Sequence, residues 1–183
     1  MINLEEIIEG CRRKNGKAQK KLYDEYAASL LGVCIRYTGN KSDAEDILQE
    51  GFIKIFLNFN EYSGKGSLFG WMKKIMINTA ITLYYRNLKH NKTLDIYEID
   101  PNDINQEDEE TPDLEYTAEE LLNIINGMPS GYRVVFNLFA IEGYKHKEIS
   151  EMLGIDESTS KSQYARAKKW IQNKLISYNK IRR

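Results

Sequence analysis

The sequence predicts an all-α protein of two small helical domains joined by a flexible acidic linker. Apolar residues recur at the three- and four-residue spacing of amphipathic helices along most of the 183 residues, and alternating strand patterns are missing from the sequence. Only three prolines interrupt this pattern. The formal net charge is −1, but the charged side chains are distributed very unevenly along the chain.

The charge distribution divides the chain into three segments. Residues 1–92 carry 15 basic and 10 acidic side chains, residues 93–120 carry 12 acidic and no basic ones, and residues 121–183 carry 11 basic and 5 acidic ones. Two basic bodies separated by an acidic segment indicate two modules that bind one polyanion through a connection that avoids it. The predicted first domain, linker and second domain are residues 1–91, 92–116 and 117–183.

Helical periodicity predicts four helices in the first domain. They lie near Leu4–Arg13, Ala18–Thr38, Ser42–Asn58 and Leu68–Asn87. The third helix has one apolar face, formed by Ala44, Ile47, Leu48, Phe52, Ile55 and Phe56. The loop Glu61–Ser67, EYSGKGS, contains two glycines, which permit sharp turns.

The predicted linker cannot bury enough apolar area to offset the entropy of ordering it. It contains the acidic run QEDEE and two of the three prolines, so we expect a flexible tether. The second domain begins at Thr117, which can cap a helix whose first turn contains Glu119 and Glu120. Further helices are predicted at about Gly131–Glu142, His146–Leu153 and Glu157–Ile176.

The last two predicted helices form a helix-turn-helix. Ile149 and Leu153 lie one turn apart and face inward, and Gly154 can adopt the left-handed conformation that ends a helix. Asp156 can then cap the next helix. Two positions depart from this pattern: Lys145 stands where Ser or Thr would complete a capping box with Glu148, and Ser160 occupies a position expected to be apolar.

The second of these helices presents short hydroxyls and bases on one face. Its core stripe is Tyr164, Ala167, Ile171 and Leu175. The outward side chains are Ser158, Lys161, Ser162, Ala165, Arg166, Lys168 and Lys169. Lysines neutralise phosphates and Arg166 could read a guanine edge, so this face suits the DNA major groove. The alternative is a solvated basic face on a purely structural helix.

An acidic helix stands beside these basic bodies. DAEDILQEGFIKIF places Asp43, Glu45, Asp46, Gln49 and Glu50 on the faces that its apolar stripe leaves free. Such a surface suits a basic protein partner better than a nucleic acid. The alternative is a solvated helix start favoured by the helix dipole, which explains Asp43 to Asp46 better than Gln49 and Glu50.

The segment SLFGWMKKIMINTAITLYYRN interleaves aromatic and basic residues. Leu68, Trp71, Met72, Ile75, Thr79 and Leu83 are predicted to form its core stripe. Lys74, Asn78 and Tyr85 share another face. Aromatic rings stack on unpaired bases at about 1–3 kcal/mol each, and an amide such as Asn78 can hydrogen-bond an exposed base edge. The segment predicts a single-strand binding surface, although Phe69 and Trp71 individually also fit plain core packing.

Taken together, these segments resemble a bacterial RNA polymerase sigma factor of the small, two-domain extracytoplasmic-function group. The resemblance is collinear over nearly the whole chain. It rests on LYDEYAASLLGVCIRYTGN, DAEDILQEGFIKIF, GSLFGWMKKIMINTA and MPSGYRVVFNLFAIEGY, followed by the helix-turn-helix. The resemblance is weakest in the acidic linker. It implies a sigma region 2 bundle and a sigma region 4 helix-turn-helix.

The resemblance also implies roles for matching residues. The helix that docks on core polymerase contains Asp43, Asp46, Gln49 and Glu50. The segment that melts and reads the minus-ten promoter element contains Phe69, Trp71, Lys73, Lys74 and Asn78. Tyr62 and Lys65 lie in the loop that captures a flipped base. The minus-thirty-five element is read by a helix with Lys161, Ser162, Gln163 and Arg166, flanked by Ser158 and Lys169 of the outward face.

The implied function is promoter recognition and strand opening, with no catalytic residue, no cofactor and no metal site. The implied partners are core RNA polymerase, duplex and melted promoter DNA, and, as a further possibility in this family, an anti-sigma factor. We expect a cytoplasmic bacterial protein, monomeric when free, without membrane insertion. Cys11 and Cys34 are too few for a disulfide framework. Two other classes compete: a stand-alone transcriptional regulator, and a helical enzyme or scaffold with incidental basic helices.

Overall fold

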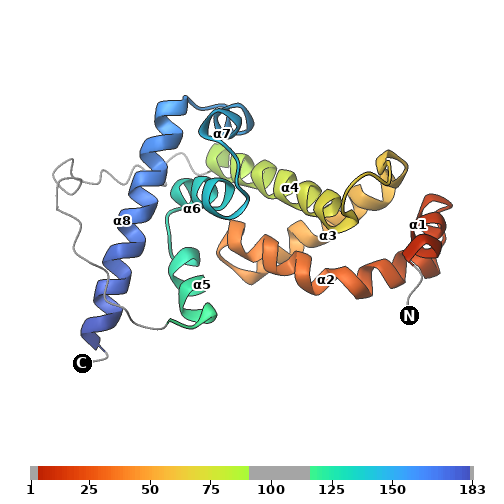
Figure 1. The fold of residues 1–183 in the computed structure, drawn as a ribbon, viewed down its shortest axis with the longest axis horizontal. Coiled ribbons are helices and arrows are strands. Elements are labelled where there is room, and N and C mark those ends of the chain that lie inside the picture. The colour runs from red at the N-terminus through yellow and green to blue at the C-terminus, as the bar shows by residue number, and fades with distance from the viewer. Residues whose placement is uncertain (1–3, 91–115, 182–183) are drawn as a thin grey trace. The chain divides into compact units, whose positions relative to one another are not determined.

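The computed structural model describes residues 4–90 and 116–181 (Figure 1). Every regular element in these two ranges is a helix, which confirms the predicted all-α class. The chain forms two compact units, Met1–Arg86 and Asn87–Arg183. The predicted acidic linker lies, apart from Tyr116, outside the described residues. The proposed domain boundaries therefore stay predictions.

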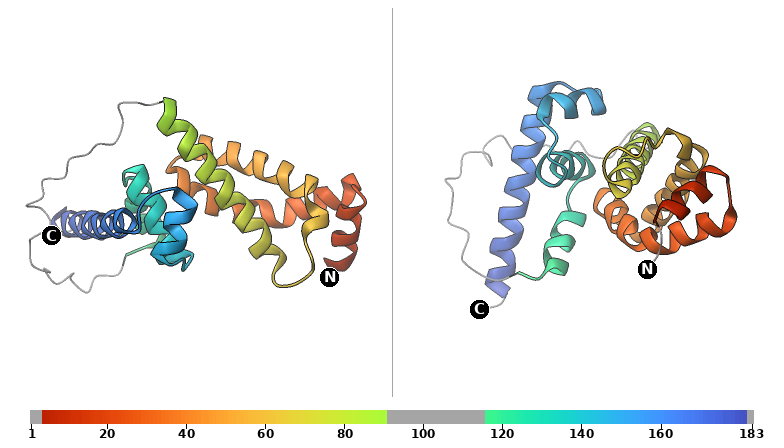
Figure 2. Two further views of the ribbon diagram at one scale, coloured as in Figure 1. Left: turned by 90° about the horizontal axis from the view of Figure 1, so that it is seen from above. Right: turned by 45° about the vertical axis from the view of Figure 1, so that its right-hand side comes forward.

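The first unit contains four helices and a short 3-10 turn. These elements are α1 (Leu4–Arg12), α2 (Gly16–Thr38), α3 (Lys41–Leu57), η1 (Phe59–Glu61) and α4 (Leu68–His90). Each helix end lies within three residues of its predicted position. Figure 2 shows α1 at the same end of this unit as the connection between α3 and α4.

Short polar side chains and one glycine define the helix ends in the first unit. The Asn15 side chain accepts hydrogen bonds from the backbone N–H groups of Lys17 and Ala18 at the start of α2. Gly39 ends α2 with φ of 75°, and Asn40 caps α3 by accepting from the N–H of Asp43. These side chains satisfy amide groups that a helix start leaves unpaired.

The core of the first unit is formed by the inner faces of α2, α3 and α4. On α3, Ala44, Ile47, Leu48, Phe52 and Ile55 are buried as predicted, whereas Phe56 is half-buried. On α4, the buried residues are Leu68, Met72, Met76, Ile77, Thr79, Ala80 and Ile81. The predicted core residues Trp71, Ile75 and Leu83 are half-buried. The buried face of α4 is therefore rotated from the predicted stripe.

Helices α1 and α2 approach each other closely at a glycine. A Cβ atom added to Gly10 would lie 2.5 Å from Cβ of Ala18, and neither carbon belongs to a flexible side chain. Gly32, on an exposed part of α2, would meet no atom within 4 Å. Alanine therefore fits at position 32 but not at position 10 unless α1 and α2 move apart.

We predict that Gly10→Ala lowers the free energy of unfolding by about 1–3 kcal/mol, because α1 must move away from α2. Gly32→Ala should raise it by about 0.5–1 kcal/mol through helix propensity. Urea unfolding followed by circular dichroism measures both. Equal effects of the two substitutions would contradict close packing at Gly10.

The second unit contains α5 (Ala118–Asn126), α6 (Ser130–Phe136), the π-helical turn η3 (Asn137–Ile141), α7 (His146–Leu153) and α8 (Glu157–Ile181). The predicted capping role of Thr117 is confirmed. Its hydroxyl accepts from the N–H of Glu120 at 3.2 Å, and the Glu120 carboxylate accepts from the N–H of Thr117 at 2.8 Å. Helix α8 extends five residues beyond the predicted end.

The predicted helix Gly131–Glu142 is present, but its second half is π-helical instead of α-helical. The chain widens into η3, where the Glu142 N–H donates to the carbonyl of Asn137, five residues earlier. Asn137 is fully buried, and its side-chain amide donates to the carbonyl of Arg133 at 2.8 Å. A buried polar side chain that bonds the preceding turn is a local event that the apolar periodicity of the sequence does not reveal.

The core of the second unit joins α6 to α8. Met128, Tyr132 and Ala167 are buried, and Phe136, Trp170 and Ile171 pack against them. The guanidinium of buried Arg133 donates to the carbonyls of Asn126 and Met128 at 2.7 and 2.9 Å, which satisfies the end of α5. Of the four core residues predicted on α8, only Ala167 is fully buried.

Candidate functional site

The outer face of α3 presents part of the predicted acidic surface. Asp46 and Gln49 are exposed. Asp43 is half-buried and belongs to the helix start, where its carboxylate accepts from the Asn40 amide at 2.9 Å. Within the described residues, Asp46 and Gln49 are the two members of the predicted set whose side chains form no hydrogen bond or ion pair.

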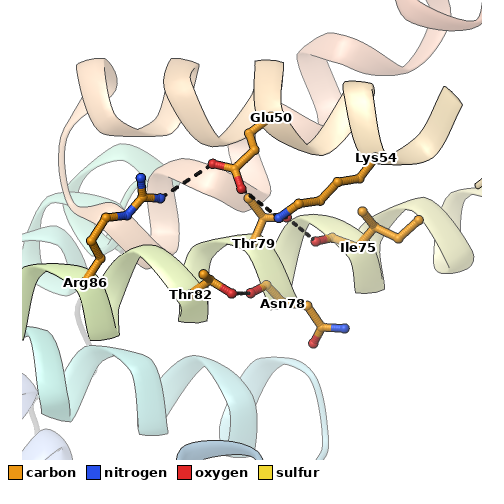
Figure 3. A network of polar contacts seen from close by, with 7 residues as sticks. All are labelled: Glu50, Lys54, Ile75, Asn78, Thr79, Thr82 and Arg86. Atoms are coloured by element: carbon orange, nitrogen blue, oxygen red, sulfur yellow. Dashed lines mark hydrogen bonds and ion pairs between the residues drawn. The ribbon is translucent and has the colours of Figure 1, made fainter. Parts of the chain in front are cut away.

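Glu50 has a structural role that the sequence did not reveal. Its carboxylate lies 2.7 Å from Lys54 Nζ on the same helix and 3.6 Å from a guanidinium nitrogen of Arg86 on α4 (Figure 3). Lys54 Nζ also donates to the hydroxyl of buried Thr79 at 3.1 Å. The hydrogen bond from Lys54 lowers the pKa of Glu50, with help from Arg86. This network connects α3 to α4.

Two exposed apolar residues extend the acidic face of α3. Ile53 is 59% exposed and Leu57 is 70% exposed. They follow Asp46 and Gln49 at helical spacing, so the four side chains share one side of the helix. The predicted docking surface omits both residues, because it was defined by the acidic side chains alone. Two apolar residues outside the core stripe of an amphipathic helix were the signal in the sequence that could have identified this surface.

The connection between α3 and α4 is a short structured loop. Gly64 and Gly66 have φ of 77° and 80°, in the region that favours glycine, and Lys65 between them is exposed. The Tyr62 hydroxyl donates to the carbonyl of Gly66 at 3.0 Å and so closes the loop. Lys65 therefore stands at the tip of a defined turn.

The Tyr62 ring faces inward in this structure. It is 5% exposed and packs against Phe59 and Trp71, with ring centroids 6.5 and 5.5 Å away. Trp71 is half-buried in the same cluster. The ring is therefore buried in this structure, and a contact of Tyr62 with DNA stays a prediction.

The predicted single-strand surface on α4 is present in part. Lys74 and Asn78 are exposed, and Figure 3 shows the Asn78 side chain on the side of α4 turned away from Glu50 and Lys54. Lys73 is half-buried. Phe69 is also half-buried and stacks against Tyr26 at a centroid distance of 6.3 Å. Lys74 and Asn78 lie one turn apart on one side of α4, together with half-buried Trp71, whereas helical spacing places Phe69 and Lys73 toward the opposite side.

The helix-turn-helix of the second unit has the predicted geometry. Ile149 and Leu153 are buried, and Gly154 ends α7 with φ of 51°. The Glu148 carboxylate accepts from the N–H of Lys145 at 2.8 Å. Because the lysine side chain has no acceptor, only this half of a capping box is possible.

His146 explains why a serine occupies position 160. Ser160 is fully buried, and its hydroxyl lies 3.0 Å from Nδ1 of His146. The imidazole ring stacks on Phe139 at a centroid distance of 4.2 Å and lies near Tyr164. Burial and the charge of Lys161 lower the pKa of His146, and Glu157 acts in the opposite direction. A polar contact therefore joins α7 to α8.

The predicted side chains on the outward face of α8 differ in how far they are exposed to solvent. Ser158, Lys161 and Ser162 are exposed, whereas Gln163, Arg166 and Lys169 are half-buried. Lys161 is paired with Glu157, one turn earlier, at 2.7 Å. Part of the positive charge on this face is thus neutralised within the helix.

Residues 4–90 and 116–181 contain no group of three or more His, Cys, Asp or Glu side chains that could hold a metal ion. In the same ranges, the helices fall short of the length and hydropathy needed to cross a membrane. Cys11 and Cys34 are buried free thiols, and burial raises the pKa of each, to about 11 and about 12.

Two family models match the chain. Residues 22–90 match sigma-70 region 2, and residues 118–171 match sigma-70 region 4. The ECF RNA polymerase sigma-E factor of Haemophilus influenzae is 25% identical over 92% of this chain and 93% of its own length. The RNA polymerase sigma-H factor of Pseudomonas aeruginosa is 24% identical over 93% of each chain.

A solved structure shares the fold. The sigma factor RpoE of Bartonella quintana, in a co-crystal with the anti-sigma factor NepR, aligns over 85% of this chain and 95% of its own with a TM-score of 0.51 and 17% identity. The chain belongs to the sigma-70 family. Within that family its relatives place it in the extracytoplasmic-function group, so it is a promoter-directing RNA polymerase sigma factor.

The lowered pKa of His146 gives a pH prediction. In the folded unit His146 binds a proton less readily than in the unfolded chain. Its contribution to the free energy of unfolding is therefore fully present above about pH 6.5. That contribution is lost as the pH falls below this value toward the folded pKa. Trp71→Phe leaves Trp170 as the single tryptophan and so reports on the second unit. The urea midpoint seen by Trp170 should fall between pH 7.5 and 5.5, and His146→Gln should remove most of that fall. An unchanged pH dependence in His146→Gln would contradict this role.

Proposed function

We propose that the two units divide promoter recognition between three surfaces. The outer face of α3 docks on core polymerase, the surface of α4 and its preceding loop takes the melted minus-ten element, and the outward face of α8 reads the minus-thirty-five duplex. One observation carries this proposal. Helix α3 packs one face into the unit and exposes the other, which presents Asp46, Gln49, Ile53 and Leu57.

The docking face combines charge with apolar area. Asp46 and Gln49, with Asp43 at the helix start, suit a basic helical partner, and Ile53 and Leu57 add apolar surface that water covers in the free protein. Charged groups at such a surface contribute specificity and association rate, and the apolar pair contributes burial. Glu50 lies at the edge of this face and is already held by Lys54 and Arg86. Its contribution to docking is therefore secondary in this proposal.

Strand opening needs no chemical step. The melted strand exchanges base stacking and pairing for contacts with Phe69, Trp71 and the amide of Asn78, while Lys65 and Lys74 follow the phosphates. Lys73 and Tyr62 complete the predicted set at the edge of this surface. On α8, Lys161, Arg166 and Lys169 neutralise phosphates or read base edges, and the short side chains of Ser158 and Ser162 let the helix enter the groove, with Gln163 beside them.

The remaining expectations follow from this function. A protein that only positions polymerase on DNA needs neither catalysis nor a cofactor, and it acts in the cytoplasm, where the polymerase is. The acidic linker repels duplex DNA and so keeps the two units on separate promoter elements. An anti-sigma factor is a further proposed partner, supported by the likeness in fold to RpoE crystallised with NepR.

The docking proposal predicts a charge-specific loss. Asp46→Lys should weaken binding to core polymerase at least about tenfold, because the substitution places a cation opposite a basic partner. Glu45→Lys is the matched control. Glu45 is exposed on the same helix, lies outside the four residues of the proposed face and pairs with Lys41 at 3.6 Å. Fluorescence anisotropy of the labelled protein titrated with core polymerase measures both. Equal losses for the two variants would refute the assigned face.

The α8 proposal predicts opposite effects of two neighbouring substitutions. Glu157→Gln should strengthen binding of the minus-thirty-five duplex about two- to threefold, because it frees the charge of Lys161. Lys161→Ala should weaken it and reduce the slope of log affinity against log salt by about one. Lys174→Ala is the control, since Lys174 lies over the Trp170 ring near the far end of α8. A salt slope unchanged in Lys161→Ala would show that Lys161 does not contact phosphate.

A further inference from the structure

Helix α1 lies outside the residues that either family model matches, yet it contacts the loop before α4. The region 2 match begins at residue 22, whereas α1 ends at Arg12. From this last turn, the Arg12 guanidinium donates a hydrogen bond of 2.9 Å to the backbone carbonyl of Tyr62, fifty residues away. Helix α1 also packs against η1, which precedes the loop.

Arg12 and its neighbour Arg13 differ in their hydrogen-bond partners. Both lie near the carboxylate of Glu9, at 3.9 Å for Arg12 and 2.9 Å for Arg13. The Arg13 side chain is 77% exposed and points to solvent, whereas that of Arg12 is 36% exposed. Adjacent arginines thus carry the same charge on the same turn, but only Arg12 has a recorded bond to the loop.

The loop that Arg12 reaches is restrained at several points. The Tyr62 carbonyl is held by Arg12, and the Tyr62 hydroxyl is bonded to the carbonyl of Gly66. The Ser67 hydroxyl accepts from the N–H of Gly70 at 3.3 Å, which connects the end of the loop to the first turn of α4. With Tyr62 packed between Phe59 and Trp71, the loop backbone is fixed relative to α4.

We propose that Arg12 is a positioning residue for the recognition of the melted minus-ten strand, and that α1 serves as a brace for the loop Tyr62–Ser67. This inference rests on the proposed function of the loop and α4. A loop held in one conformation before DNA arrives loses less conformational entropy on binding, so removal of the brace weakens binding without removing any DNA contact. Arg12 itself does not touch the DNA in this account.

The test compares Arg12→Met with Arg13→Met, each assembled with core polymerase. The probe is a fork-junction DNA whose minus-ten element is unpaired, built from a promoter that the protein transcribes in a run-off assay. We expect Arg12→Met to weaken binding about five- to tenfold, the effect of one charge-assisted hydrogen bond, and Arg13→Met to leave it unchanged. Arg12→Lys, which keeps a donor, should recover part of the loss.

A second measurement separates positioning from general stability. Hydrogen exchange of the peptide covering residues 60–67 should accelerate in Arg12→Met and remain unchanged in Arg13→Met. Tyr62→Phe keeps the ring but removes the bond to Gly66, and it should weaken fork binding to a similar extent. If Arg12→Met lowers the melting temperature, the exchange rate decides, and unchanged exchange of residues 60–67 in that variant overturns the proposal.

Lys65→Ala separates a failure of the proposed brace from a failure of the proposed DNA contact of the loop. Lys65 is exposed at the loop tip and takes no part in the brace. If Lys65→Ala and Arg12→Met both weaken fork binding, the proposal is supported. If Lys65→Ala weakens binding while Arg12→Met behaves as Arg13→Met does, the brace is overturned but the function of the loop stands. If Lys65→Ala has no effect, the proposed DNA contact of the loop is what fails.

Discussion

The packing of α4 against α3 is the contact on which the proposed function of the first unit depends. Gly51 permits it, because a Cβ at this position would collide with the side chain of fully buried Met76. Beside this contact, Glu50 holds Lys54 and Arg86, and Lys54 reaches Thr79 (Figure 3). The pair is therefore fixed by both apolar and ionic contacts. It leaves the outer face of α3 available for a protein partner and the far side of α4 available for DNA.

Under the proposed function, this arrangement presents a separate surface of one small domain to each of two partners. A strand-opening surface functions only if its amide and aromatic groups are already placed when the bases unstack, because each contact replaces stacking worth only a few kcal/mol. Packing on α3 places the helix, and the loop bonds place its start. The second unit uses the same principle on a smaller scale, since the contact of His146 with Ser160 sets the recognition helix against α7.

The sequence predicted what local chemistry determines and missed what distant residues determine. The helix bounds, the cap at Thr117 and the turn at Gly154 follow from neighbouring residues, and the structure agrees. The role of Ser160 was missed because its partner His146 lies fourteen residues away, and that of Glu50 because Arg86 lies on another helix. The bond between Arg12 and the Tyr62 carbonyl spans fifty residues, which no periodicity encodes. The exposed pair Ile53 and Leu57 was visible in the pattern but was not used.

The most direct test adds the purified protein to the core polymerase of its host on host genomic DNA, maps the transcripts, and probes unpaired thymines with permanganate. The account predicts discrete new start sites with reactive thymines just upstream of each. It also predicts that substitution of Asn78 by alanine abolishes the reactivity while the polymerase still occupies the promoter. Unaltered transcription with the wild-type protein, or full thymine reactivity with the Asn78 variant, would contradict the account.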